Sequence, residues 1–199
     1  TTPMLHWPDS MVTYCPEEEI LFSNDGFGQH LATTERFADE VDFDRDYLDE
    51  ARRYYTNIVG KYGVQVQQLL KKAGNLTISR ICPLHGPIWR ENLSAILEKY
   101  QLWSTYTPEE KGVVIAYASI YGNTELACQA LAHELSQQGV RDVKLLDLSR
   151  EHPSYVLAEA FRYSHLVLAP VTYNGDLFPD MEHFIRSLIA HGLKGRTIA

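Results

Sequence analysis

The sequence predicts an α/β fold whose second half is built on a parallel sheet, and two observations support this. Three apolar runs have the length and composition of buried strands: VVIAYA (113–118), VKLLDL (143–148) and HLVLAPV (165–171). Apolar residues recur at helical spacing in three segments between and after them: 124–138, 154–162 and 180–191. Near-continuous apolar strands that alternate with helices are typical of a parallel sheet covered on both faces.

A fourth strand of this sheet is expected to begin in GRTIA (195–199). A parallel sheet that stops at this strand has an unfinished edge. We therefore expect the sheet to be incomplete within these residues.

The first half has a different pattern. MVTY (11–14) and EILFS (19–23) predict a hairpin joined by the turn CPEEE, and the glycine-containing loop NDGFGQH (24–30) follows it. Helices are expected over about 46–59, 65–73 and 92–100, with a strand over 76–81 that leads into CPLHGPIWR (82–90).

Charge and apolar content exclude some functions. The net charge is −8, and residues 1–110 hold 10 Lys/Arg against 17 Asp/Glu. Nucleic acid binding needs a basic face, so we expect no nucleic acid partner. No apolar run approaches the roughly 18 residues of a membrane span, so we expect no membrane association. The net charge is thus −7 over residues 1–110 and −1 over residues 111–199, and this difference predicts a domain boundary near STYTPEEKG (104–112).

The three cysteines, Cys15, Cys82 and Cys128, are too few and too scattered for a disulfide framework. They indicate a reducing compartment, and we expect a cytoplasmic protein.

The turn between the first strand of the second half and its helix has the chemistry of an anion site. It comprises Ser119, Ile120, Tyr121, Gly122, Asn123 and Thr124. Ligands of doubly wound sheets bind where a helix N-terminus presents free N–H groups. The turn lacks the lysine of a triphosphate-binding loop, and its neutral donors suffice for a single phosphate. The alternative is a plain helix N-cap made by Asn123 or Thr124.

YASIYGNTE (117–125) is similar to the FMN-phosphate loop of flavodoxins. VTYNGDLFPDM (171–181) resembles the loop that holds the isoalloxazine ring in flavodiiron proteins, also called A-type flavoproteins. The resemblance implies FMN contacts from Thr172, Tyr173, Asn174 and Gly175, although many members have proline where this chain has Val171. Taken without that loop, Tyr173 would be an aromatic side chain that packs over a turn.

The first half resembles the metallo-β-lactamase-like domain that precedes flavodoxin in the same family, through LFSNDGFGQH (21–30) and CPLHGPIWR (82–90). The resemblance implies that Asp25 is a catalytic and metal-binding carboxylate that bridges two irons. It also implies that His85 is a catalytic histidine ligand of one of them. Carboxylate and imidazole suit non-haem iron. Taken alone, Asp25 could be a turn residue bonded to its own backbone, and His85 a surface histidine.

Other candidates carry less weight. We interpret His6 in LHWPDS (5–10) and His30 as structural groups that orient ligands, and Cys82 as a buried thiol at a strand end.

The resemblance covers nearly the whole chain. It implies an α/β protein with the C-terminal part of a metallo-β-lactamase-like αββα domain (1–108) and most of a flavodoxin-like doubly wound parallel sheet (109–199), both incomplete. The H-x-E-x-D motif of the family is absent from these residues. We therefore expect an internal fragment that is inactive by itself, because two ligands cannot hold a diiron pair.

For the full-length protein the resemblance implies a flavodiiron oxidoreductase. Electrons would pass from a rubredoxin-like donor through FMN to a non-haem diiron site that reduces O2 to water, NO to N2O, or both. The family arrangement implies a head-to-tail homodimer.

Two alternatives remain open at this stage. One is an FMN-binding electron-transfer protein whose lactamase-like domain is a metal-free scaffold. The other is a zinc hydrolase fused to a flavodoxin, which gives the flavin no task.

Overall fold

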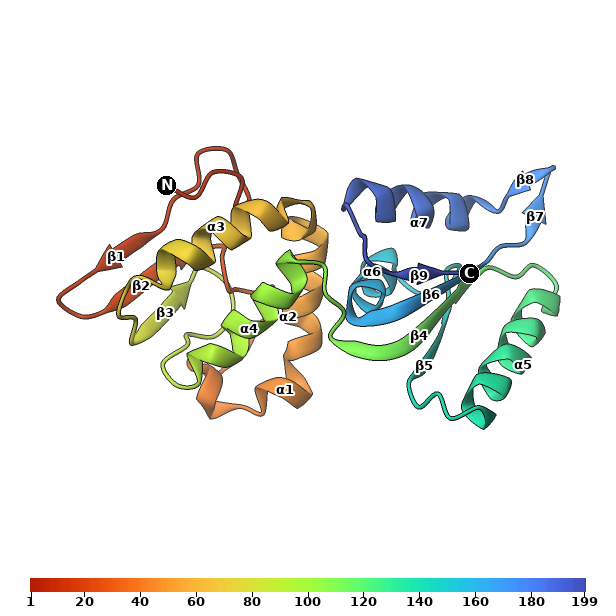
Figure 1. Ribbon diagram of the computed structural model, residues 1–199, viewed down its shortest axis with the longest axis horizontal. Helices are drawn as coiled ribbons and strands as arrows, with labels where there is room; N and C mark the ends of the chain where they lie inside the picture. Colours follow the sequence, from red (N-terminus) through yellow and green to blue (C-terminus); the bar gives the residue numbers. More distant parts are fainter. The chain divides into compact units, whose positions relative to one another are not determined.

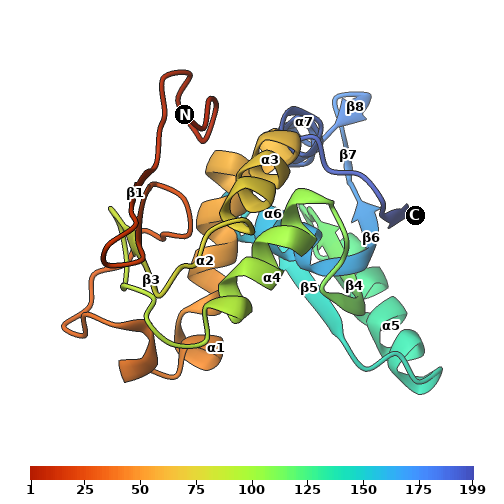
Figure 2. The ribbon, with the colours of Figure 1, turned by 60° about the vertical axis from the view of Figure 1, so that its left-hand side comes forward.

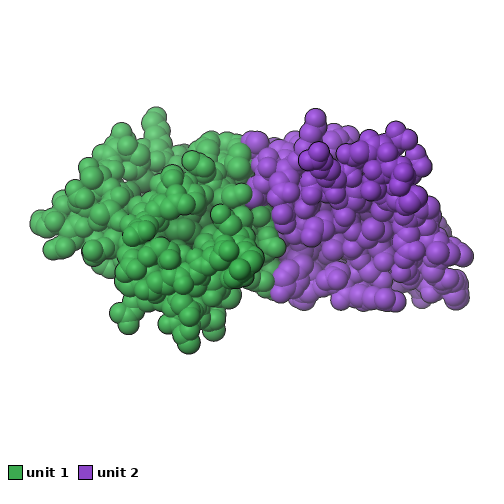
Figure 3. Space-filling view, turned by 90° about the horizontal axis from the view of Figure 1, so that it is seen from below, with its two compact units in different colours: residues 1–105 green, residues 106–199 purple.

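The computed structural model describes all 199 residues and divides them into two compact units, Thr1–Thr105 and Tyr106–Ala199 (Figure 3). The division falls a few residues before position 108, where the sequence led us to expect a domain boundary. Each unit encloses its own apolar core, so each can be described by itself.

The first unit contains a three-stranded sheet (Figure 1). β1 (Thr13–Cys15) and β2 (Ile20–Asn24) form the expected antiparallel hairpin, and β3 (Arg80–Pro83) pairs with β2 in parallel. Side chains alternate across the sheet, so Leu21 is buried while Phe22 is about half exposed. Because β2 and β3 run parallel, their carboxyl ends lie at the same edge of this sheet.

Helices supply the rest of the first core. They are α1 (Phe43–Asp46), α2 (Leu48–Tyr54), α3 (Gly63–Ala73) and α4 (Leu93–Ser104), with short 3-10 helices at Ala38–Glu40 and Gly60–Tyr62. α4 buries Ile96, Tyr100 and Trp103, which follow one another at spacings of four and three residues and so share one face. The rings of Tyr100 and Trp103 pack with those of Tyr55 and Phe27 in a single aromatic cluster.

Two first-half predictions differ from the structure. The helix expected over 46–59 is broken, because Tyr47 separates α1 from α2 and a π-helical segment spans Tyr55–Val59. The strand expected over 76–81 begins only at Arg80, where the chain first pairs with β2. Leu76 and Ile78 line an apolar groove with α3 and α4 instead, which explains why their sequence resembles a strand.

The second unit is built on a four-stranded parallel sheet, and Figure 2 shows it from another side. The strand order is β5 (Val143–Asp147), β4 (Glu110–Tyr117), β6 (Tyr163–Ala169) and β9 (Thr197–Ile198). All its paired neighbours run parallel. The predicted α/β fold with a parallel sheet is confirmed.

Helices cover both faces of this sheet. Val114 and Ala116 of β4 pack in one core with α6 (Pro153–Arg162) and α7 (Pro179–Ala190). Val113 and Ile115 pack in another core with Cys128 of α5 (Asn123–Gln137). β4 is therefore buried on both sides, which is why its sequence is apolar almost without interruption.

A small hairpin follows β6. β7 (Thr172–Tyr173) and β8 (Asp176–Leu177) pair across the two-residue turn Asn174–Gly175, and both turn residues have positive φ. This is the backbone geometry of tight hairpin turns. The hairpin lies at the carboxyl end of the sheet, directly before α7.

In neither unit does any helix combine the length and the apolar character that crossing a bilayer requires.

Candidate functional site

The first candidate site lies at the carboxyl edge of the β2–β3 pair. Asp25 follows β2 directly, and His85 stands two residues beyond β3. The backbone N–H of Leu84 donates to the carbonyl of Asn24 (2.8 Å), so the pairing of the two chains continues to the site. Parallel pairing thus brings together two residues that are 60 positions apart in the sequence.

The Asp25 carboxylate faces two histidines, one on each oxygen. His85 Nε2 lies 3.5 Å from Oδ1, and His6 Nε2 lies 3.2 Å from Oδ2. The Asp25 side chain is 14% exposed, whereas His6 and His85 are 28% and 46% exposed. The carboxylate is therefore the inner group of the cluster, and each imidazole reaches it from a separate loop.

Two further aromatic rings border His85. The His30 ring stands edge-on to His85 at 4.9 Å and to Tyr54 at 4.9 Å. Burial, and secondly the charge of Asp25, raise the pKa of Tyr54, so its phenol keeps its proton at neutral pH. His30 thus packs against His85, and its role in orienting ligands stays a prediction.

The two loops of this site touch closely. The N–H of Gln29 donates to the carbonyl of His85 (3.2 Å), and a Cβ on Gly28 would lie 2.6 Å from that same oxygen. Gly86 has φ of +82°, and a Cβ there would lie 2.8 Å from Gln29 Cγ. Glycine at both positions lets the loops approach within hydrogen-bonding distance.

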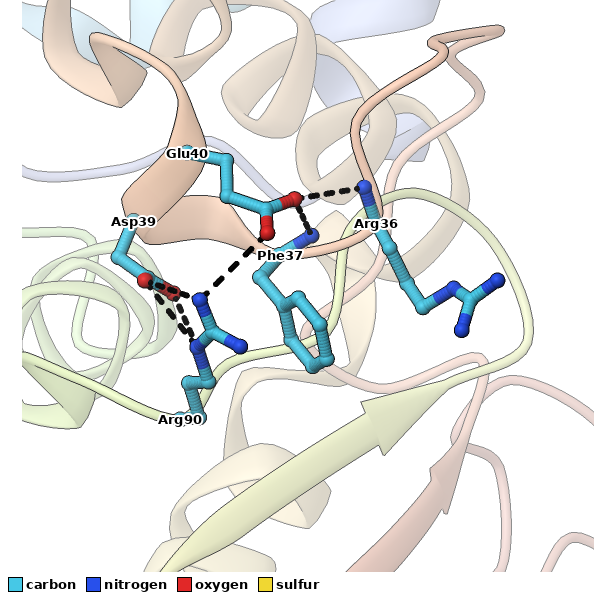
Figure 4. A network of polar contacts seen from close by, with 5 residues as sticks. All are labelled: Arg36, Phe37, Asp39, Glu40 and Arg90. Atoms are coloured by element: carbon cyan, nitrogen blue, oxygen red, sulfur yellow. Dashed lines mark hydrogen bonds and ion pairs between the residues drawn. The ribbon is translucent and has the colours of Figure 1, made fainter.

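Farther from the site, an ion pair between Arg90 and Asp39 joins the chain that follows His85 to the chain that follows His30 (Figure 4). We call Arg90, Asp39, Glu40 and Phe37 the charged clamp. Arg90 donates from Nε and Nη2 to the Asp39 carboxylate at 2.8–3.1 Å and stacks over the Phe37 ring at 3.7 Å. Glu40 accepts the backbone N–H groups of Arg36 and Phe37, both at 3.1 Å. Ile88 lies between His85 and Arg90 in the sequence. Its N–H donates to the Arg36 carbonyl, and its carbonyl accepts the N–H of Ala38.

The donor chemistry of Asp25, His6 and His85 suits a first-row transition metal such as iron. No three His, Cys, Asp or Glu side chains of the chain meet in a geometry that would hold a metal ion by themselves. These residues therefore fit part of a metal centre.

The second candidate site lies at the carboxyl end of the four-stranded sheet. The chain leaves β4 toward α5 on one face of the sheet and leaves its neighbour β6 toward α7 on the other. Ligands of doubly wound sheets bind in the crevice that forms where neighbouring connections diverge in this way. Residues 119–124 and 172–175 follow these two strands.

The start of α5 is open to an anion. Gly122, not Asn123 or Thr124, is the N-cap residue, and no side chain caps the helix. Its φ is +85°, and the position a Cβ would take has no atom within 4 Å. The hydroxyl of Ser119 accepts the N–H of Gly122 (3.1 Å), which leaves the first N–H groups of the helix for a ligand. The open loop fits a single phosphate, and the alternative of a plain N-cap by the side chain of Asn123 or Thr124 is not what the structure has.

The ring-binding candidates are exposed on the β7–β8 hairpin. Tyr173 is 46% exposed and stands edge-on to Phe178 at 5.9 Å, so it presents part of its ring to solvent. Tyr121, in the phosphate loop, is 89% exposed. Exposed aromatic rings beside an anion site are suited to stack on a planar ligand.

Comparisons with known proteins point to one family. A nitric oxide reductase of Moorella thermoacetica is 39% identical over 189 residues, which are 94% of this chain and 47% of that protein. The flavodiiron protein from Giardia intestinalis superimposes with a TM-score of 0.94 and 33% identity, covering 99% of this chain and 48% of that one. The rubredoxin oxygen:oxidoreductase of Desulfovibrio gigas gives a TM-score of 0.92 and 30% identity, covering 100% of this chain and 50% of that one.

The chain belongs to the flavodiiron family. No family model matches it, so the assignment rests on these individual proteins. The chain spans about half the length of the flavodiiron relatives it matches. The resemblance to flavodiiron proteins inferred from the sequence motifs is confirmed.

In this flavodiiron chain, two site residues were given too little weight by sequence reasoning. His6 lies nearer to the Asp25 carboxylate than His85 does, although it belongs to an irregular segment 19 residues upstream. Its only signal was its place in LHWPDS. Nothing in the sequence marked Tyr54 as a residue near the site, because a tyrosine on a helix is ordinarily a core residue. Cys82 is half-buried rather than buried.

Proposed function

We propose that this chain is part of a flavodiiron oxidoreductase that uses FMN and a non-haem diiron centre to reduce O2, NO or both. The observation that carries the proposal is the Asp25 carboxylate with a histidine at each oxygen, in a chain whose second unit has an open phosphate loop. Relatives named nitric oxide reductase and rubredoxin oxygen:oxidoreductase support both the reaction class and the two gases.

Asp25 would bridge the metals, with His85 on one side and His6 on the other. A shared carboxylate offsets the repulsion between two cations, and each imidazole supplies a neutral nitrogen donor. When bound, the iron pair supplies electrons and Lewis acidity to the gas. Three side chains cannot complete two iron coordination shells, so the remaining ligands would come from elsewhere in the full-length protein.

Residues around the metals would have supporting tasks. His30 would hold the His85 ring by edge-on packing. Tyr54 keeps its proton because burial raises its pKa, so its hydroxyl could donate a hydrogen bond toward the site. Phe27 and Trp89, both nearly fully buried, would exclude water from the inner side of the Asp25 loop.

In the second unit, the FMN phosphate would sit on the open start of α5, held by Ser119, Asn123, Thr124 and the backbone amides of Ile120 and Tyr121, while Gly122 would let the backbone approach it closely. Residues 172–175 would border the flavin ring, with Tyr173 as the exposed aromatic contact. The flavin would accept electrons from a rubredoxin-like donor. A head-to-tail homodimer and a cytoplasmic location stay predictions.

The test uses the full-length gene product, because the chain spans only about half the length of its relatives. Asp25→Asn keeps the shape of the side chain and removes its charge. We expect the consumption of O2 and NO with a reduced rubredoxin donor to fall by more than 100-fold, since loss of a direct ligand exceeds the roughly 10–100-fold cost of changes around it.

Glu17→Gln is the matched control, because it removes an exposed carboxylate of the β1–β2 turn. It should leave gas consumption unchanged. An Asp25→Asn variant with wild-type turnover would show that Asp25 is no metal ligand and would favour an electron carrier without a metal centre.

A further inference from the structure

The loop that carries Asp25 is held in a backbone conformation that its own residues do not favour. Gly26 N–H donates to the Ser23 carbonyl (3.0 Å), and the Ser23 hydroxyl donates to the Gly26 carbonyl (2.6 Å), so Asp25 sits inside a tight turn. Asn24 and Phe27 flank it with φ of +55° and +65°. Asparagine tolerates this region, but a bulky aromatic residue rarely enters it.

Two buried side chains hold Phe27 in this conformation. Its N–H donates to the Tyr100 hydroxyl at 2.7 Å, and its carbonyl accepts the Trp89 indole N–H at 3.2 Å. The Phe27 and Tyr100 rings also pack at 4.5 Å. Trp89 is 3% exposed and Tyr100 is 0% exposed, so water cannot replace either bond. Strained backbone persists only where its surroundings fix it in this way, and it concentrates at functional sites.

Trp89 also belongs to the segment of the second ligand. It stands four residues after His85, and its backbone exchanges two hydrogen bonds with Ile81 of β3 (2.8 and 2.9 Å). The backbone of Trp89 is thus fixed to the strand that leads to His85, while its indole is bonded to the loop of Asp25. Tyr100 joins the same loop to α4 in the centre of the aromatic core.

We propose that Trp89 and Tyr100 are positioning residues that fix the distance between the Asp25 carboxylate and the His85 imidazole. Neither residue is a ligand. Each acts by one hydrogen bond to the backbone of Phe27, two residues after Asp25. The inference rests on the proposed metal site and adds to it the hydrogen bonds that hold the loop of Asp25 in its conformation.

Trp89→Phe and Tyr100→Phe test it, because each keeps an aromatic ring and removes the one group bonded to Phe27. The measurements are the dissociation constant for Fe²⁺ alone, by competition with a chelator, and the urea midpoint of the metal-free full-length protein. Tyr14→Phe is the control, since it removes a hydroxyl of the same unit whose bond goes to the Thr77 carbonyl.

We expect Fe²⁺ to bind about 10–100-fold more weakly to Trp89→Phe and Tyr100→Phe, the range for residues that orient metal ligands, and with wild-type affinity to Tyr14→Phe. The absorption spectrum of Co²⁺ at the site should change in the same two variants. A purely structural role would lower the urea midpoint and leave the Fe²⁺ affinity of the folded protein unchanged, which would overturn the inference.

The outcomes separate this inference from the proposed function. If the wild type binds Fe²⁺ and Asp25→Ala does not, while Trp89→Phe and Tyr100→Phe bind normally, only the positioning role fails. If Asp25→Ala binds Fe²⁺ as the wild type does, the metal site itself is wrong, and the positioning role fails with it.

Discussion

At the scale of single residues, the ion pair between Arg90 and Asp39 makes a contribution to stability that depends on pH. The Arg90 guanidinium, through its paired hydrogen bonds, holds the pKa of the Asp39 carboxyl below its usual value of about 3.9. A carboxyl with a lowered pKa in the folded state stabilises the fold above its unfolded pKa, and this contribution is lost as pH falls through the folded value.

We therefore predict that, as the pH falls below about 4, the urea midpoint of the wild type decreases more steeply than the urea midpoint of Arg90→Gln. High salt should weaken the difference, because both side chains lie at the surface. Parallel pH profiles of wild type and Arg90→Gln at low salt would contradict a role for the clamp in stability. Lys99→Gln, a change of equal charge on α4, serves as the control.

At the scale of elements, Arg196 fixes the end of α6. Its guanidinium donates to the carbonyls of Ala160 and Phe161 in the last turn of α6 and to the Tyr106 carbonyl (2.6 Å). Burial lowers its pKa to about 10, so it remains a cation at neutral pH. A cation at a helix C-terminus bonds carbonyls that have no partner within the helix.

Arg196→Met keeps much of the volume and removes every donor. We predict a loss of about 1–3 kcal/mol in the free energy of unfolding of the second unit, because partly buried carbonyls are left unpaired. Arg186→Met breaks only an exposed pair with Glu182 and should cost about 0.5 kcal/mol or less. Equal effects of the two changes, measured by urea unfolding, would contradict the role of Arg196.

The elements also show how far the sequence can predict this molecule. Period and strand length predict β4, β5, β6 and the three helices between and after them, because each is stabilised mainly by its own apolar pattern. The break of the long helix into α2 and a π-helical segment could not be predicted, since it depends on packing among Tyr55, Tyr100 and Trp103. Asp25 and His85 were singled out because the motifs that contain them resemble those of flavodiiron proteins, whereas each residue taken alone had an ordinary structural explanation. His6 was not, because only the folded chain brings its irregular segment to Asp25.

At the scale of the whole molecule, the two proposed cofactor sites belong to separate compact units with separate cores. Asp25, His6 and His85 belong to the first unit, and the phosphate loop belongs to the second. Loss of either cofactor should therefore leave the other in place. If Thr124 binds the phosphate as proposed, Thr124→Ala removes a hydrogen bond of about 1.5–3 kcal/mol and should weaken FMN binding at least tenfold.

The most direct test is the number of iron atoms and FMN molecules per chain in three full-length proteins after dialysis: the wild type, His85→Ala and Thr124→Ala. We predict that His85→Ala loses iron and keeps FMN, and that Thr124→Ala loses FMN and keeps iron. Full iron in His85→Ala, or the loss of both cofactors from either variant while it remains folded, would contradict separate iron and FMN sites that depend on these residues.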